Sequence, residues 1–181
     1  DTYQLADVFL PLNEEKEISR FLDLLFGNPF NTPTQDEYAM FLAFGASLRS
    51  GDLSRQVGAV VVSEKGDVVG VGANDVPRRG GGLYWTGEDD QRDYIKGDDS
   101  NEMMRERIVA DVVKRLQPVG TEVSEWEKFA RAQLTSSPLM DITEYGRAVH
   151  AEMEALLACT RTGTSSRRGT LYSTTFPCHN C

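Results

Sequence analysis

The chain has 181 residues, of which 40% are hydrophobic, and its formal net charge is −9. This size and composition predict one globular domain with an insertion, and the acidic balance argues against a surface that binds nucleic acid, because phosphate binding needs clustered lysine and arginine. Two of the three cysteines form a C-x-x-C, which favours a reducing compartment and a metal over disulfides. No apolar run has the length of a membrane span and no signal peptide is visible, so we expect a cytoplasmic protein without membrane contact.

Two amphipathic helices are predicted near the N-terminus. Residues 14–26 place apolar side chains at helical spacing before Gly27 and Pro29, which typically end a helix. We interpret this helix as structural cover or as a linker from a preceding domain. Thr34 and Glu37 form a capping-box pattern that begins the second helix, which we expect to pack against a sheet.

Two valine-rich runs then predict a β-hairpin. Residues 57–63 and 68–73 are joined by a short glycine-containing turn, and their successive apolar positions indicate that both faces are covered. Asn74 closes the second run. Asparagine is a common turn residue, but strand ends also contact ligands, so Asn74 is a candidate for both roles.

Residues 75–100 lose all periodicity and are rich in glycine, arginine and aspartate. A segment of this kind is either a mobile surface loop or a lid over a substrate. In the second case Arg78 or Arg79 would reach a phosphate, and Trp85 or Tyr84 would close over it. Acidic residues near Asp89 could assist Mg²⁺ on a triphosphate, although a solvated surface fits them better.

Two further helices are predicted before the last third of the chain. Met104 to Leu116 carries one apolar stripe, and Ser124 with Glu127 caps the next helix. With the preceding loop they form an insertion, assigned to residues 75–140. Core packing is the favoured interpretation of their apolar faces, and contact with a partner is the alternative.

The last third of the chain holds an H-x-E that starts at His150 and a P-C-x-x-C whose cysteines are Cys178 and Cys181. One histidine and two thiolates supply three ligands of a tetrahedral Zn²⁺ and leave the fourth position for a water that ionises near neutral pH, which is the design of catalytic zinc. Glu152 would lie beside that water, where a carboxylate can carry protons. The motif therefore predicts a catalytic zinc site.

Local patterns around the motif place its residues on regular elements. A helix is predicted over residues 150–160 and a strand over residues 169–174. Pro177 opens a further expected helix, on which Cys178 and Cys181 would share one face.

The cysteines could in principle have a redox role or a purely structural one. A lone C-x-x-C occurs in redox pairs and in structural zinc sites, but the chain has no second C-x-x-C. His179 lies between the two cysteines and would point away from a metal that they hold. Cys159 falls among alanine and leucine in the predicted helix, which is typical of a buried core thiol.

Taken together, the motifs resemble the deoxycytidylate deaminase branch of the cytidine deaminase superfamily. The residues that carry this resemblance are His150-Ala151-Glu152, residues 169–181, residues 54–62 and Asn74. Residues 74–77 and 80–85, with the long insertion, are more narrowly similar to bacterial anti-phage deaminases that act on dCTP and dCMP. In that family a P-loop kinase-like domain precedes the deaminase.

The resemblance implies a role for each matching residue. His150, Cys178 and Cys181 would bind Zn²⁺, and Glu152 would be the proton shuttle. In addition, Asn74 would contact the sugar and the backbone of Ala151 the base carbonyl. The implied fold is a three-layer α/β/α sandwich around a mixed sheet, with the helical insertion between the hairpin and the zinc motif.

The resemblance also implies a domain organisation and an activity. Residues 1–30 are interpreted as a linker and helix from a preceding domain, and residues 31–181 as a deaminase domain that is incomplete at its C-terminus, since the chain ends on Cys181. The activity would be zinc-dependent hydrolysis of dCTP or dCMP to dUTP or dUMP and ammonia, in a homo-oligomer that depletes nucleotides during phage infection. Alternatives are a housekeeping dCMP deaminase, a deaminase acting on nucleic acid, and a binding module in which zinc only holds the fold.

Overall fold

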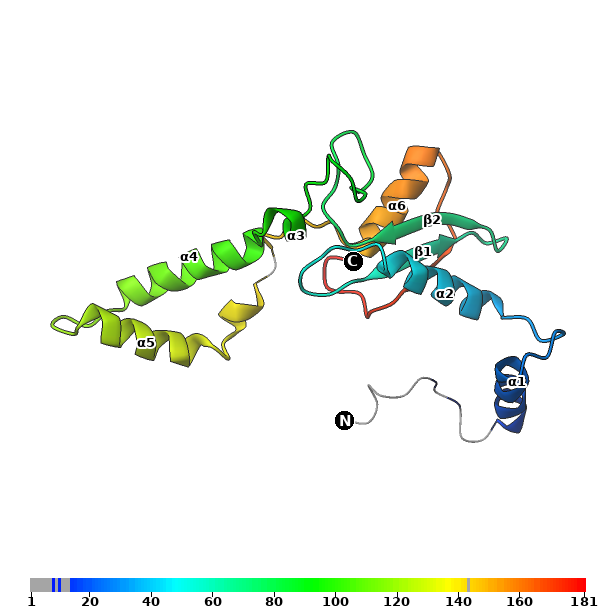
Figure 1. Cartoon of the computed structure of the whole chain (residues 1–181), viewed down its shortest axis with the longest axis horizontal. Helices are drawn as coiled ribbons and strands as arrows, with labels where there is room; N and C mark the ends of the chain where they lie inside the picture. The colour runs from blue at the N-terminus through cyan, green and yellow to red at the C-terminus, as the bar shows by residue number, and fades with distance from the viewer. Residues whose placement is uncertain (1–7, 9, 11–13, 143) are drawn as a thin grey trace. The chain divides into compact units, whose positions relative to one another are not determined.

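The computed structural model describes residues 8, 10, 14–142 and 144–181 (Figure 1). Most of the first ten residues, which belong to the expected linker of residues 1–30, lie outside this described part. The chain divides into two compact units, Asp1–Tyr38 and Ala39–Cys181.

The first unit contains α1 (Glu15–Leu25), which confirms the first expected helix, and the start of α2 (Gln35–Ser47). No residue of α1 is buried. The capping box of α2 is confirmed, because the Thr34 N–H donates to the Glu37 carboxylate over 2.7 Å and the Glu37 N–H donates to Thr34 Oγ1 over 3.3 Å. Arg20 on α1 also donates to the Glu37 carboxylate at 2.5 Å, which ties the two helices of this unit together.

The second unit is built on three strands, β1 (Gly58–Val62), β2 (Val68–Ala73) and β3 (Thr170–Ser173), in the order β2-β1-β3. The expected hairpin and the expected third strand are both confirmed. Both neighbouring pairs are antiparallel. Among the described residues the sheet is therefore antiparallel throughout, whereas a mixed sheet was expected.

Helices cover both faces of this sheet, as the valine-rich strands predicted (Figure 1). Val60 and Val62 pack with Ala39 and Ala43 of α2 on one face. On the other face, alternate strand residues pack against α6 (Ala151–Thr162), the helix that carries the H-x-E; the core there is Val57, Ala59, Val61, Ala151, Ala155 and Cys159. The three α/β/α layers are thus confirmed, and Cys159 is the buried core thiol that its neighbours indicated.

Two glycines allow the helices to lie close to the sheet. A Cβ added at Gly58 would be 1.9 Å from the carbonyl oxygen of Ala43 on α2, and one added at Gly72 would be 2.2 Å from that of Ala151 on α6. Any larger residue at either position would push the helix away from the strand. Gly72 therefore helps to set the position of the first residue of α6.

The insertion contains α3 (Asp93–Lys96), α4 (Ser100–Arg115), α5 (Val123–Leu134) and the 3₁₀ turn η2 (Pro138–Asp141). The long helices α4 and α5 were expected, whereas the two short elements were not. The prediction that Ser124 caps α5 was wrong, because the helix begins at Val123 after an extended Glu122 and has no side-chain cap.

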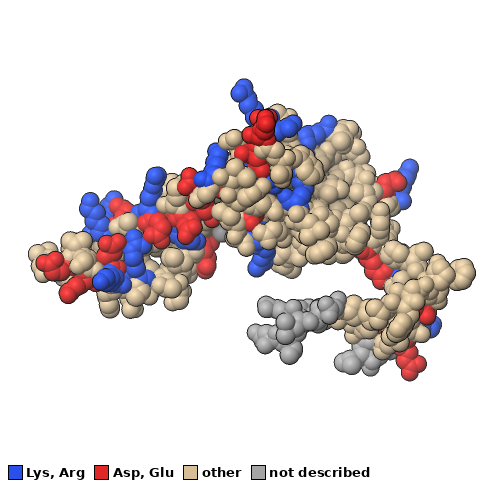
Figure 2. All heavy atoms as spheres, viewed as in Figure 1, with Lys and Arg blue, Asp and Glu red and all other residues tan. Residues whose placement is uncertain are grey.

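The faces that α4 and α5 turn toward each other form their own small core. Val109 and Val113 of α4 pack with Ala130 of α5, and the Trp126 indole N–H donates to the Val113 carbonyl over 2.7 Å. This supports the core-packing interpretation of the apolar stripes. Figure 2 shows acidic and basic side chains interspersed over this pair of helices, without a continuous basic stripe on the visible face. None of the described helices combines the length and apolar character needed to cross a bilayer.

Candidate metal centre

His150 stands at the N-terminus of α6 and is its N-cap residue, with extended backbone angles and no side-chain capping bond. Its imidazole is therefore available to a ligand. The backbone just before it is held by the segment that follows β2, since the Val149 N–H donates to the Asp75 carbonyl over 2.9 Å. The helix extends to Thr162 and is capped by Gly163 in the left-handed conformation, slightly beyond the predicted range of residues 150–160.

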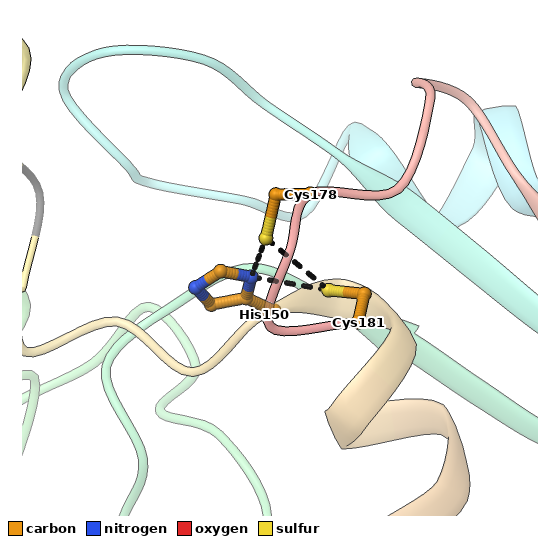
Figure 3. A group of neighbouring side chains, drawn as sticks. All are labelled: His150, Cys178 and Cys181. Atoms are coloured by element: carbon orange, nitrogen blue, oxygen red, sulfur yellow. Dashed lines mark hydrogen bonds between the residues drawn. The ribbon is translucent and has the colours of Figure 1, made fainter.

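The two cysteines lie on the segment that follows β3. Residues 178–181 form a turn in which the Cys181 N–H donates to the Cys178 carbonyl over 3.0 Å, where the sequence had suggested the start of a helix. The turn nevertheless directs both thiols toward His150, as Figure 3 shows.

The three donor atoms form a compact triangle. His150 Nδ1 lies 3.3 Å from Cys178 Sγ and 3.2 Å from Cys181 Sγ, and the two sulfurs are 3.7 Å apart. Tetrahedral zinc with ordinary bond lengths separates its donors by about 3.8 Å between sulfurs and about 3.6 Å between nitrogen and sulfur. Within the described part of the chain this is the one such group placed to hold a metal ion, and its donor set fits Zn²⁺.

The thiols differ in their electrostatic surroundings. Burial of the Cys181 thiol raises its pKa to about 12, and the neighbouring Cys178 thiol and Glu152 carboxylate act in the same direction. A hydrogen bond from the Asn180 backbone instead lowers the pKa of Cys178. Two adjacent thiolates beside a carboxylate are unfavourable on their own, so this arrangement suits a bound dication.

Glu152 lies beside the donor triangle without belonging to it. Its side chain is only 6% exposed, and Oε1 accepts a 2.8 Å hydrogen bond from the Ser173 hydroxyl on β3. Oε2 lies 3.5 Å from Cys181 Sγ. One carboxylate oxygen is therefore fixed by the sheet while the other faces the site. Sequence reasoning missed Ser173, although its place at the end of a strand just before the P-C-x-x-C was a usable signal.

A cavity of about 470 Å³ opens at this site. That volume falls within the range of small-molecule pockets. Its lining brings together the zinc motif and the strand-end asparagine that the sequence singled out. It includes Asn74, His150, Ala151, Glu152, Cys178 and Cys181.

Asn74 has a clear structural role at the cavity wall. Its Oδ1 accepts hydrogen bonds from the Val57 N–H at 2.6 Å and the Ser50 hydroxyl at 3.0 Å, and its Nδ2 donates to the Arg55 carbonyl at 2.7 Å. These contacts confirm the turn role and hold the amide rigidly beside the cavity. The sugar contact of Asn74 and the base contact of the Ala151 backbone stay predictions.

The loop residues predicted to form a phosphate clamp or lid lie elsewhere. The tip of the loop is near the C-terminal end of α6, since a Cβ on Gly81 would be 3.1 Å from Arg161 Cδ, whereas the metal donors lie at the N-terminal end. Arg78, Arg79 and Trp85 do not line the cavity. The guanidinium of Arg49 instead lies over the Trp85 ring, with Arg49 Cζ 3.7 Å from the ring centroid. None of these contacts involves a phosphate or a substrate, so the phosphate role of Arg78 and Arg79 and the lid role of Trp85 stay predictions.

The same loop is anchored by a buried ion pair that sequence reasoning did not find. Arg92 Nη2 donates to Asp90 Oδ2 at 2.6 Å, and Nη1 lies 3.4 Å from Asp75 Oδ2. The hydrogen bonds from Arg92 hold the pKa of Asp90 at about 2. The neighbouring Asp89, the predicted Mg²⁺ candidate, is exposed.

A comparison of the sequence with known protein families covers every residue of this site. The family model of the cytidine and deoxycytidylate deaminase zinc-binding region matches residues 33–181. The chain belongs to this family. Among curated proteins, none matches the sequence significantly. Membership, together with the histidine and cysteine donors, identifies a zinc-dependent hydrolytic deaminase.

Proposed function

We propose that this deaminase acts on free deoxycytidine nucleotides, converting dCTP or dCMP to dUTP or dUMP and ammonia, and that this depletes the nucleotide pool during phage infection. The substrate class is supported by the composition of one cavity. Its lining includes Glu152 and the zinc donors, and also Asn74, Arg55 and Arg105. A base, a sugar and a phosphate each have a suitable group there. The antiviral role rests on the similarity of residues 74–85 to the anti-phage deaminases.

In this proposal Glu152 carries the protons of the reaction, which its position beside the metal donors supports, with Oε2 3.5 Å from Cys181 Sγ. Zinc held by the three donors supplies Lewis-acid polarisation and lowers the pKa of water. The oxygen of water forms a bond to C4 of the cytosine ring while Glu152 takes a proton from it and delivers it to N3. The second proton goes to the exocyclic amine, the C4–N bond breaks, ammonia leaves and Glu152 returns to its ionised form.

Ser173 and Asn74 would assist without exchanging protons. The Ser173 hydroxyl holds Oε1, so Oε2 is left as the proton-carrying oxygen. The rigid Asn74 amide has a second N–H with which to bind a sugar hydroxyl. The homo-oligomer and the preceding P-loop domain implied by the resemblance also belong to this proposal.

Product analysis tests the substrate class. The zinc-loaded protein is incubated separately with dCTP, dCMP and single-stranded DNA, and uracil-containing products are measured. We expect turnover of at least one free nucleotide and none of the DNA. Turnover of the DNA alone would contradict the proposal, and turnover of dCMP without dCTP would favour the housekeeping role.

A further inference from the structure

The start of α4 forms part of the wall of the catalytic cavity. Asp99, Asn101 and Arg105 line the same cavity as His150 and Glu152. Asp99 is the N-cap of α4, and its carboxylate accepts hydrogen bonds from the backbone N–H groups at positions 101 and 102, at 2.8 and 3.1 Å. The insertion therefore contributes directly to the catalytic pocket.

Several contacts tie this wall to the segment that leads into the metal site. Asn101 Nδ2 donates to the Ile142 carbonyl at 2.7 Å, and its Oδ1 accepts from the Tyr145 N–H at 3.3 Å. The Ser100 hydroxyl also donates to the Tyr145 carbonyl at 3.0 Å. Since the chain runs directly from Tyr145 to His150, α4 has a defined place at the pocket.

Three guanidinium groups line the cavity, and they differ in how they are paired. Arg147 forms a short ion pair with Asp93 and is neutralised by it. Arg55 donates to the hydroxyl of Thr175 over 3.2 Å, and Arg105 donates through Nη1 to a backbone carbonyl over 3.2 Å. Both of these partners are neutral groups.

Arg105 has further unused donor capacity. Its Nε is buried and, among the described residues, has no hydrogen-bond partner. A buried N–H without an acceptor costs free energy, so a ligand that brings an acceptor to this position gains a hydrogen bond and removes that cost. Three other carboxylates that line the cavity are already used, because Asp52 accepts from the Arg55 N–H, Asp99 caps α4 and Asp93 pairs with Arg147.

We propose that Arg105, with Arg55, binds the phosphate group of the deoxycytidine nucleotide, so that the helical insertion selects nucleotides over nucleosides. This inference rests on the proposed function, in which the base lies at Glu152. A guanidinium presents several N–H donors in a fixed fork and binds phosphate oxygens through paired, charge-assisted hydrogen bonds. The proposal gives the insertion a role in specificity and assigns phosphate binding to α4 instead of the Arg78–Arg79 loop.

Steady-state kinetics on dCTP, dCMP and deoxycytidine test this assignment. The variant is Arg105→Gln, and the matched control is Arg107→Gln, an exposed arginine on the same helix that does not line the cavity. We expect Arg105→Gln to raise the KM for both nucleotides by about tenfold or more relative to the KM for deoxycytidine, which carries no phosphate. Arg105→Lys, which keeps the charge but loses the fork, should recover part of the effect.

A second readout does not depend on turnover or on the base. Calorimetric titration with inorganic tripolyphosphate should show weaker binding to Arg105→Gln than to Arg107→Gln, with zinc content equal in both proteins. Equal binding by the two variants, or a KM that rises equally for nucleotides and nucleoside, would overturn the inference. A wild-type protein that binds tripolyphosphate through Arg105 but deaminates no free nucleotide would instead contradict the proposed function.

Discussion

The Ser173 hydroxyl donates a 2.8 Å hydrogen bond to the Glu152 carboxylate, and this bond joins β3 to the N-terminal end of α6. It restricts the movement of a carboxylate that lies beside the zinc donors. Under the proposed mechanism Ser173 therefore positions the proton carrier, and its loss should affect the rate more than binding.

Replacing Ser173 with alanine should lower kcat by about tenfold, which corresponds to one ordinary charged hydrogen bond of roughly 1.5 kcal/mol. The KM and the zinc content should change little, since Ser173 is not a donor to the metal. Thr170→Ala, at an exposed position on the same strand, is the control. Equal losses in both variants would show that the effect comes from the strand and not from the hydrogen bond.

Enlarging Gly72 should disturb the metal site from a distance. A Cβ there would lie 2.2 Å from the Ala151 carbonyl, so Gly72→Ala has to displace the start of α6. We expect a loss of roughly 1–3 kcal/mol in the free energy of unfolding and a weaker affinity for zinc, measured by denaturation and chelator competition. Gly45→Ala is the control, because nothing lies near that position and alanine favours a helix. A Gly72→Ala protein as stable as wild type would contradict the close packing.

The Asp90–Arg92 pair should make stability depend on acid pH. The pKa of Asp90 is held at about 2, below its usual value of 3.8, so its contribution is fully present above about pH 4 and is lost as pH falls toward 2. Asp90→Asn should lower the free energy of unfolding at pH 7 by roughly 1–3 kcal/mol and flatten its pH dependence between pH 4 and 2. Denaturation between pH 7 and pH 2 measures the free energy of unfolding of this variant, and Asp89→Asn, at an exposed position, is the control. Identical profiles for the two variants would argue that the buried pair adds no stability.

The Arg78–Arg79 loop offers a direct comparison with the α4 site. Because the tip of this loop lies at the far end of α6 from the metal donors, the structure favours an unchanged KM for dCTP when both arginines are replaced by alanine. A rise comparable to that in Arg105→Gln would instead support the lid interpretation made from the sequence. Kinetic measurement of the double variant decides between them.

Local sequence patterns predicted the parts of this protein that depend on near neighbours. The Thr34–Glu37 capping box and the valine-rich hairpin were confirmed because each is defined by a few adjacent residues. The zinc donors were equally accessible, since the ligand types are rare in the chain and their spacing is characteristic.

The remaining features depend on contacts between distant segments. Ser173 reaches Glu152 across 21 positions, and Arg105 enters the pocket only because α4 is bonded to the residues before His150. No periodicity or spacing encodes such meetings. The start of α5 was misplaced for a different reason, because Ser124 offered a plausible cap that the backbone did not use.

The most direct test of the central claim compares wild type with Glu152→Gln on dCTP and dCMP, measuring uracil nucleotide, ammonia and bound zinc. Glutamine keeps the shape of the side chain but cannot carry the proton, so we expect kcat to fall by roughly 10²- to 10⁴-fold while about one zinc per chain is retained. Glu154→Gln is the control, since this buried carboxylate on the same helix pairs with Arg161 away from the site. Unchanged turnover in Glu152→Gln with zinc still bound would contradict the assignment of Glu152 as the proton carrier of a zinc deaminase.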